Sequence, residues 1–349
     1  MSFGAVNLLR CGLLVALLPV LGGCYLLQAA GGQMAVMAKR QPVEEVVRNP
    51  QTSPQLRARL VEVGSARDFA SRALGLPDND SYRQYADIGR SYVVWNVFAT
   101  PSFSVEPRRW CFPVAGCVVY RGYFSEHRAQ AYAGRLRRKG DDVAVGGVTA
   151  YSTLGHFADP ILSSMLPYSD AQLAGTVFHE LAHQLIYIQD DSAFNEAFAS
   201  TVEEVGVMRW FTLSGRQRDL EAWQQQQRRA GEFSRLLLDA RDELRGLYDQ
   251  SLPPIDKNHR KQQILGRLKF SYEQQRSRWG GYPGYDSWFA RTLSNADLVA
   301  TATYRRCIPG FKRILAASGD DLSEFYRRVR ELKQETQAAR QRLLCSGFD

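Results

Sequence analysis

A run of apolar residues at helical spacing follows Ser169. The apolar stripe consists of Val177, Leu181, Leu185 and Ile188. This spacing predicts a helix that is fixed to a core along one face. Ser169 and Gln172 form a capping box at its start, and we expect the helix to end near residues 189–191. Ser192 is a suitable cap for a second helix, which opens with residues 193–199.

The segments on either side of this helix pair have different patterns. Residues 92–99, 117–120 and 142–151 are rich in β-branched and aromatic residues and predict strands, the last with a break at Gly146 and Gly147. A helix is expected between the second and third strands, over residues 128–138. Residues 25–100 are otherwise expected to be mostly helical, with prolines as breaks.

After Gly206 the chain becomes strongly helical and polar. Residues 216–250 and 256–278 predict two long helices that form an antiparallel hairpin. Residues 293–308 and 322–344 predict the final helices. The whole pattern indicates an α+β fold with a small sheet and a mainly helical C-terminal half.

The N-terminus has the pattern of an export signal. Arg10 precedes an apolar run from Cys11 to Leu21, which is too short to span a bilayer. The run ends in Leu-Gly-Gly-Cys24, which resembles a bacterial lipobox, so cleavage before Cys24 would leave a lipidated cysteine. Several acyl chains would hold the protein on a membrane without a spanning helix. An uncleaved short anchor is the other interpretation.

These patterns divide the chain into four parts. We expect a lipoprotein signal peptide over residues 1–23, an N-terminal helical region over 24–90, a catalytic α+β core over 91–211 and a helical region packed on that core over 212–349. The mature chain is long enough to bury a substantial core.

Four cysteines remain once Cys11 and Cys24 are set aside. Cys111, Cys117, Cys307 and Cys345 are an even number, which suggests two disulfides in an oxidising compartment. The prediction is Cys111–Cys117 and Cys307–Cys345, one of three possible connectivities. Zinc binding by these cysteines is disfavoured because no paired short Cys spacing occurs.

The formal net charge of +8 does not indicate a nucleic-acid partner. The densest basic run, Arg135–Lys139, has no aromatic residues interleaved with it. A solvated face, or attraction to anionic lipid headgroups, explains it better.

The first expected helix of the pair carries His179-Glu180-Leu181-Ala182-His183. Two histidines four apart project from one helical face and can bind one ion. Glu180 lies beside them, where it can take a proton from a water molecule. This spacing predicts a zinc hydrolase, although the residues do not exclude other divalent ions.

The third ligand is expected from the second helix. Glu196 would complete a set of two His and one Glu, and leave a fourth position open. Glu203 and Glu204 are rival ligands. We interpret Glu203 instead as an acceptor for the N–H of a ligand histidine, with Asn195 also supporting the ligands. A metzincin site fits less well, because Ile186 and Gln189 stand where that pattern needs Gly and His.

The two helices together resemble known zinc peptidases. The zinc motif followed by Asn195-Glu196-Ala197-Phe198-Ala199 is similar to the gluzincin metallopeptidases, including the alanyl-aminopeptidase type. The chain more closely resembles a family of predicted bacterial aminopeptidases that are lipoproteins. That resemblance covers most of the mature chain and includes residues 120–124, 148–155, 159–163 and 302–304. The stretch from His183 to Glu196 is shorter than in the alanyl-aminopeptidases, so their substrate-binding details do not transfer.

The resemblance implies a zincin-like fold and several finer assignments. The strand at residues 143–151 would bind peptide backbone by strand addition, with Gly146 and Gly147 allowing close approach; the other interpretation is an ordinary sheet strand with a bulge. Tyr304 would stabilise the oxyanion, although a core tyrosine is the competing interpretation. Tyr25 after the lipidated cysteine implies the periplasmic face of the outer membrane.

The predicted function is removal of N-terminal residues from peptides by a zinc-dependent peptidase of the bacterial envelope. One zinc ion, a peptide substrate and a membrane reached through the lipid on Cys24 are the expected partners. A zinc endopeptidase and a non-catalytic envelope lipoprotein that binds a partner are the alternatives. Glu180 argues against the last, because a structural zinc site needs no base.

Overall fold

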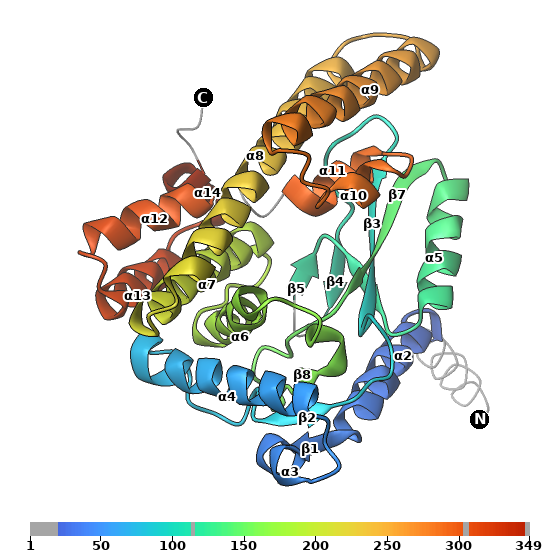
Figure 1. Cartoon of the computed structure of the whole chain (residues 1–349). Coiled ribbons are helices and arrows are strands. Elements are labelled where there is room, and N and C mark those ends of the chain that lie inside the picture. The colour runs from blue at the N-terminus through green and yellow to red at the C-terminus, as the bar shows by residue number, and fades with distance from the viewer. Residues whose placement is uncertain (1–19, 113–115, 303–306, 346–349) are drawn as a thin grey trace, which may run out of the picture.

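Helices surround three small sheets in the computed structural model, which describes residues 20–112, 116–302 and 307–345 (Figure 1). The fold is therefore α+β. The helices are α2 (Val20–Met37), α3 (Val43–Arg48), α4 (Pro54–Leu74), α5 (Glu126–Arg138), α6 (Asp170–Leu185), α7 (Ser192–Leu213), α8 (Gln217–Tyr248), α9 (Pro254–Arg278), α10 (Asp286–Phe289), α11 (Asn295–Ala302), α12 (Ile308–Ala317), α13 (Leu322–Glu331) and α14 (Gln337–Cys345). The strands are β1 (Arg40–Pro42), β2 (Gln84–Ala86), β3 (Val94–Pro101), β4 (Trp110–Phe112), β5 (Gly116–Val118), β6 (Arg121–Tyr123), β7 (Asp141–Val148) and β8 (Ile161–Leu162), and two 3₁₀ turns cover Ser163–Met165 and Leu332–Gln334.

The sheet nearest the candidate site has the order β6-β3-β7 and is antiparallel. Its two faces contact different parts of the molecule, because successive residues of a strand point to opposite sides. Val97 and Ala99 of β3 are buried in a cluster with Ala129 and Ala133 of α5, which covers one face. The alternate residues of β3 face the other way, toward the helices α6 and α7, and line a cavity described below.

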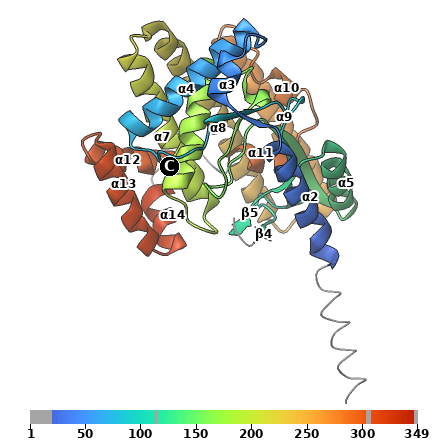
Figure 2. The same cartoon turned by 90° about the horizontal axis from the view of Figure 1, so that it is seen from below.

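The main core surrounds the helix pair α6 and α7. Helix α4 packs on α6, and Gly206 of α7 permits a close approach, because a Cβ there would lie 2.6 Å from Phe178 of α6 and 2.8 Å from Leu74 of α4. On the other side of α7, Phe198 stacks on Phe325 of α13. The helix pair is thus held from both sides by apolar contacts. Figure 2 shows that α12–α14 lie on the opposite side of the molecule from α2 and α5.

The hairpin of α8 and α9 extends away from this core and has a hydrophobic cluster of its own (Figure 1). A buried ion pair fixes the hairpin to the sheet near the turn between α8 and α9: Lys261 Nζ of α9 lies 2.5 Å from Asp142 Oδ2 of β7. The same carboxylate oxygen accepts a hydrogen bond from the backbone N–H of Asn295, at the start of α11. The polar helices therefore reach the sheet through specific buried polar contacts.

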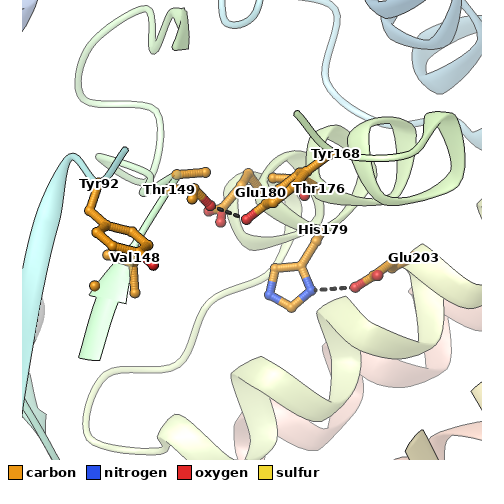
Figure 3. Close-up of a pocket in the computed structure, with 10 residues that line it drawn as sticks. Tyr92, Val148, Thr149, Tyr168, Thr176, His179, Glu180 and Glu203 are labelled. Atoms are coloured by element: carbon orange, nitrogen blue, oxygen red, sulfur yellow. Dashed lines mark hydrogen bonds and ion pairs between the residues drawn. The ribbon is translucent and has the colours of Figure 1, made fainter. Parts of the chain in front are cut away.

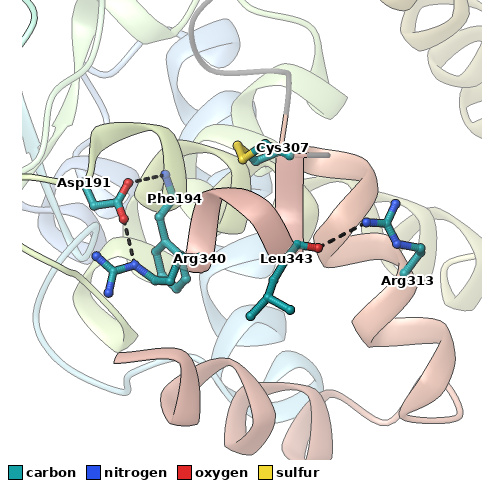
Figure 4. Close-up of a disulfide and its surroundings, with 7 residues drawn as sticks. Asp191, Phe194, Cys307, Arg313, Arg340 and Leu343 are labelled. Atoms are coloured by element: carbon teal, nitrogen blue, oxygen red, sulfur yellow. Dashed lines mark hydrogen bonds and ion pairs between the residues drawn. A yellow bond between two sulfur atoms is a disulfide. The ribbon is translucent and has the colours of Figure 1, made fainter. Parts of the chain in front are cut away.

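The C-terminal helices are tied to the start of α7 (Figure 4). The structure pairs Cys307 with Cys345, which joins α12 to α14, and it pairs Cys111 with Cys117 across β4 and β5. Arg340 Nε of α14 donates to Asp191 Oδ2 at 2.7 Å, and Asp191 Oδ1 accepts from the N–H of Phe194. This buried pair supports the helix start from which Glu196 projects.

Several boundaries differ from the sequence prediction. Helix α6 ends at Leu185 rather than near residue 190, because Ile186 adopts an extended backbone. The side chain that caps α7 is Asp191, not Ser192. Strand β7 ends at Val148 and pairs with β3 in an unbroken register from Asp141 to Val148, with no break at its glycines. Residues 322–344 form two helices and a 3₁₀ turn instead of one helix.

The N-terminal region is not purely helical. Strands β1 and β2 form a sheet with β8, so residues 40–42 and 84–86 join the segment just before α6. The predicted signal peptide lies largely in residues 1–19, outside the described residues. Within the described ranges, no helix is long and apolar enough to cross a membrane.

Candidate metal centre

His179 and His183 lie one turn apart on α6, and Glu196 comes from the second turn of α7. His183 Nε2 lies 3.2 Å from His179 Nε2. Glu196 Oε2 lies 3.3 Å from His179 Nε2, and Glu196 Oε1 lies 3.7 Å from His183 Nε2. The three side chains therefore present two imidazole nitrogens and one carboxylate to a single point.

The connection between the helices sets this geometry. Asn195 Oδ1 accepts from the N–H of Ile188 at 2.8 Å, and its Nδ2 donates to the carbonyl of the same residue at 2.7 Å. Asn195 is buried, so these two bonds hold the chain leaving α6 against the start of α7. The adjacent Glu196 is thereby placed opposite the histidines.

The donor set fits a divalent ion of the zinc type. With zinc–ligand bonds near 2.0–2.1 Å, two ligand atoms of a tetrahedron lie about 3.3 Å apart, close to the separations seen here. The electrostatics agree with a cation. Burial acts to lower the pKa of His179, but hydrogen bonds to Glu196 and Glu203 hold it well above its usual value; a cation bound at this point would take the place of the added proton, because a ligand imidazole is neutral. Burial lowers the pKa of His183 to about 4, which keeps its ring neutral, as a ligand must be.

Two carboxylates further along α7 have separate partners. Glu203 Oε2 lies 3.0 Å from His179 Nδ1, the ring nitrogen that faces away from the other ligands (Figure 3). A carboxylate in this position fixes the orientation of the ring and makes it a better donor. Glu204 instead forms an ion pair with Lys312 of α12. Glu203 and Glu204, the two alternatives to Glu196 as third ligand, therefore have different partners in the structure.

Glu180 lines both cavities, which also share His179. Burial raises the pKa of its carboxyl to about 7, opposed by the nearby His179. A bound cation would lower this pKa again, because opposite charge favours the ionised form. Glu180 thus lies where it can exchange a proton with a molecule bound beside His179.

The first cavity has a volume of about 580 Å³ and opens beside Glu203. Figure 3 shows Tyr92 and Val148 on one side, with Glu180 and His179 opposite. Gly147 also lines it. A Cβ at Gly147 would lie 2.3 Å from the ring of Tyr92, so the glycine is required for this contact. Gly146 has open space at its Cβ position and does not line either cavity.

The second cavity, about 520 Å³, lies between the helix pair and the sheet. We call its two sides the helical wall, formed by His179, Glu180, His183 and Glu196, and the sheet-side wall, formed by Tyr25, Phe98, Phe112, Tyr120 and Phe124. Tyr120 is part of the sheet-side wall. Burial, and to a smaller extent the negative charge of Glu196, raises the pKa of its phenol. No local pattern predicts this wall, because its residues come from separate segments, of which only residues 120–124 belong to the family resemblance.

A loop after β7 completes the second cavity. Tyr151 and Ser152 line it, and the loop is held by buried Asp159. The carboxylate of Asp159 accepts from Ser152 Oγ at 3.2 Å and from the N–H and Oγ1 of Thr153, both at 2.8 Å. These bonds explain why residues 148–155 and 159–163 form one feature in space.

Two predicted site residues receive no geometry. Tyr304 lies outside the described residues. Cys24 falls within the range of α2, but its side chain is not among those described. The lipid attachment and the oxyanion donor remain predictions.

Comparison with known proteins gives one match. A family model described as "Putative aminopeptidase" matches residues 24–344. No curated protein and no solved structure matches the chain.

Proposed function

Because the chain belongs to this aminopeptidase family, we propose that it is a zinc-dependent peptidase that removes N-terminal residues from peptides. The observation that carries the proposal is the convergence of His179, His183 and Glu196 on one point, with Glu180 beside it and a cavity on either side. In a zincin-like arrangement these residues hold the metal and the base. Zinc is the expected ion from the donor set of two His and one Glu.

The proposed chemistry divides the work among the side chains. A divalent ion held by His179, His183 and Glu196 would polarise the scissile carbonyl and lower the pKa of a water molecule. The Glu180 carboxylate accepts a proton from the attacking water and delivers it to the nitrogen of the leaving amine. Glu203 holds the His179 ring in orientation through Nδ1. Tyr304 is the proposed hydrogen-bond donor to the carbonyl oxygen as negative charge develops there.

The proposal includes a location. The Leu-Gly-Gly-Cys24 sequence supports lipid attachment at Cys24 and anchorage at the periplasmic face of the outer membrane. The two disulfides agree with an oxidising compartment.

An endopeptidase is the second candidate, and one observation favours it. An aminopeptidase needs an anionic group for the free α-ammonium of its substrate. Among the described residues that line the two cavities, the only carboxylates are Glu180, Glu196 and Glu203. Each of them already has a proposed role at the metal centre.

The test is a peptide pool with free N-termini and an acetylated copy of the same pool. Each is incubated with zinc-loaded protein that begins at Tyr25, and the products are read by mass spectrometry. Stepwise loss from free N-termini alone supports the aminopeptidase. Equal internal cleavage of both pools would show an endopeptidase. Activity that persists in Glu180→Gln, or no cleavage of either pool, contradicts the proposed mechanism and favours a binding lipoprotein.

A further inference from the structure

The sheet-side wall of the second cavity is aromatic and carries no charge. Its rings are contributed by α2, β3, β4, the segment before β6 and the segment after it: Tyr25, Phe98, Phe112, Tyr120 and Phe124. All the Asp and Glu side chains among the described lining residues, Glu180 and Glu196, lie on the helical wall, and no Lys or Arg is among them. Asn96 of β3 lines the same side as the rings and adds one uncharged amide. A ligand group directed at the sheet-side wall would therefore find mainly aromatic rings and no counter-ion from the described lining.

The size of the cavity restricts which group fits. The cavity volume of about 520 Å³ is many times the volume of about 30 Å³ that one water molecule occupies in the liquid. The cavity therefore has room for a large side chain. A large apolar side chain bound there would leave the solvent and gain the free energy of burying its apolar surface. A lysine or glutamate side chain placed there would leave its charge unpaired against the aromatic wall.

Tyr25 closes one end of this wall and is fixed in place. Its ring stacks on Phe112 with centroids 5.3 Å apart and meets Tyr123 edge-on at 5.5 Å. The guanidinium of Arg121 lies 4.1 Å from its ring centre, on β6. These contacts hold the Tyr25 ring in a fixed position in the wall.

Helix α2, which carries Tyr25, is docked on the sheet at two more points. Gln28 Nε2 donates to the carbonyl of Gly122 at 3.4 Å, and Gln28 Oε1 accepts from the N–H of Phe124 at 3.2 Å. One turn later, a Cβ at Gly32 would lie 2.1 Å from the ring of Phe124, so only glycine permits this approach. Ala29, between these contacts, also lines the cavity.

We propose that the second cavity binds a large, neutral apolar side chain of the peptide, aromatic for preference, at a residue that flanks the scissile bond. We further assign Tyr25 as a specificity-determining residue. The cavity contacts His179, Glu180, His183 and Glu196, so a side chain held there keeps its own peptide group beside the reacting centre. The N-terminal helix thereby takes part in substrate selection. This inference rests on the proposed peptidase function.

The experiment compares peptides that differ at one position flanking the cleaved bond, which carries Phe, Leu, Ala, Lys or Glu. For the wild-type protein we expect kcat/KM for Phe to exceed that for Ala by about tenfold or more, with Lys and Glu poorest. Tyr25→Ala should remove most of this preference while cleavage of the Ala peptide continues. Tyr25→Phe keeps the ring and should keep the preference. Leu27→Ala is the matched control, because Leu27 lies on α2 but is 73% exposed.

A second variant acts in the opposite sense. Ala29→Leu adds volume inside the cavity, so it should lower cleavage of the Phe peptide and leave the Ala peptide less affected. Equal wild-type rates for Phe and Ala, a preference for Lys or Glu, or an unchanged preference in both Tyr25→Ala and Ala29→Leu would overturn the proposal.

A binding measurement separates this inference from the proposed catalysis. Titration calorimetry of the zinc-loaded protein with the hydroxamates of L-phenylalanine and L-alanine needs no turnover. Tighter binding of the phenylalanine probe, reduced in Tyr25→Ala, supports the cavity assignment even if no peptide is cleaved. Equal affinity for the two probes contradicts it even if peptides are cleaved.

Discussion

The helical wall of the second cavity comes from two consecutive helices, whereas the sheet-side wall comes from segments spread between Tyr25 and Phe124. His179, Glu180 and His183 are placed by the repeat of one helix, and Glu196 follows after a short connection. The aromatic wall opposite depends on α2, β3 and the β4–β5 hairpin meeting in space. Local spacing thus fixes the candidate metal-binding groups, and tertiary packing fixes the surface that a substrate side chain would touch.

Glu180→Gln should have the largest effect, because it removes the proton acceptor from the helical wall and leaves its shape unchanged. We expect kcat to fall by about 10²- to 10⁴-fold, with zinc content and thermal stability retained. Steady-state kinetics on a cleaved peptide would measure the loss. The control is Glu204→Gln, since Glu204 pairs with Lys312 away from the metal ligands. A Glu180→Gln protein with near-normal kcat would place the base elsewhere.

Tyr304→Phe tests whether a residue outside the helical wall contributes to catalysis. If Tyr304 donates to the developing oxyanion, its loss should lower kcat by about 10²-fold with little change in KM. Tyr120→Phe provides the comparison, because Tyr120 lines the second cavity on the sheet-side wall. Unchanged turnover in Tyr304→Phe would remove this residue from the mechanism, and a large loss in Tyr120→Phe alone would transfer the role.

Glu203→Gln tests the support behind the helical wall. The carboxylate holds His179 through Nδ1, so we expect about a 10- to 100-fold loss in zinc affinity or activity. Competition with a chromogenic chelator would report the affinity directly. Glu204→Gln again serves as the matched neighbour, and equal losses in the two variants would argue against a specific role for Glu203.

Asp159→Asn should weaken the loop that lines the second cavity and have the smallest effect on chemistry. The amide cannot accept all the bonds that the carboxylate receives from Ser152 and Thr153, so the free energy of unfolding should fall by about 1–3 kcal/mol. Urea unfolding followed by circular dichroism would measure the change. Asp80→Asn alters an exposed carboxylate nearby and should have little effect. A loss confined to kcat with full stability would point to a direct catalytic part for Asp159.

The helices and the convergence of His179, His183 and Glu196 could be predicted from the sequence better than the aromatic wall opposite them. The capping box at Ser169 and Gln172 is present, and the long hairpin of α8 and α9 lies within a few residues of its predicted bounds. These features depend on local spacing and capping, which the sequence shows directly. The predicted pairs Cys111–Cys117 and Cys307–Cys345 are also the ones that the structure contains.

The misplaced features depend on side-chain contacts that helical spacing does not show, some of them between residues far apart in the sequence. Helix α6 stops at Leu185 although the apolar stripe continues to Ile188, because the backbone of Ile188 bonds with Asn195 instead of continuing the helix. Asp191 replaces Ser192 as the cap and also pairs with Arg340, which is 149 residues away. The place of Tyr25 in the cavity likewise follows from the docking of α2 on β6. No local pattern carries such information.

Metal stoichiometry is the most direct test of the central claim that the helical wall holds a catalytic metal. Purified wild-type protein and the variants Glu180→Gln and Glu196→Ala would each be mixed with equimolar zinc and passed through a desalting column. The zinc that remains bound would be measured by inductively coupled plasma mass spectrometry. The account predicts one zinc ion per chain in the wild type and in Glu180→Gln, and a strong loss in Glu196→Ala. No zinc in the wild type, or full retention in Glu196→Ala, would contradict the assigned ligand set.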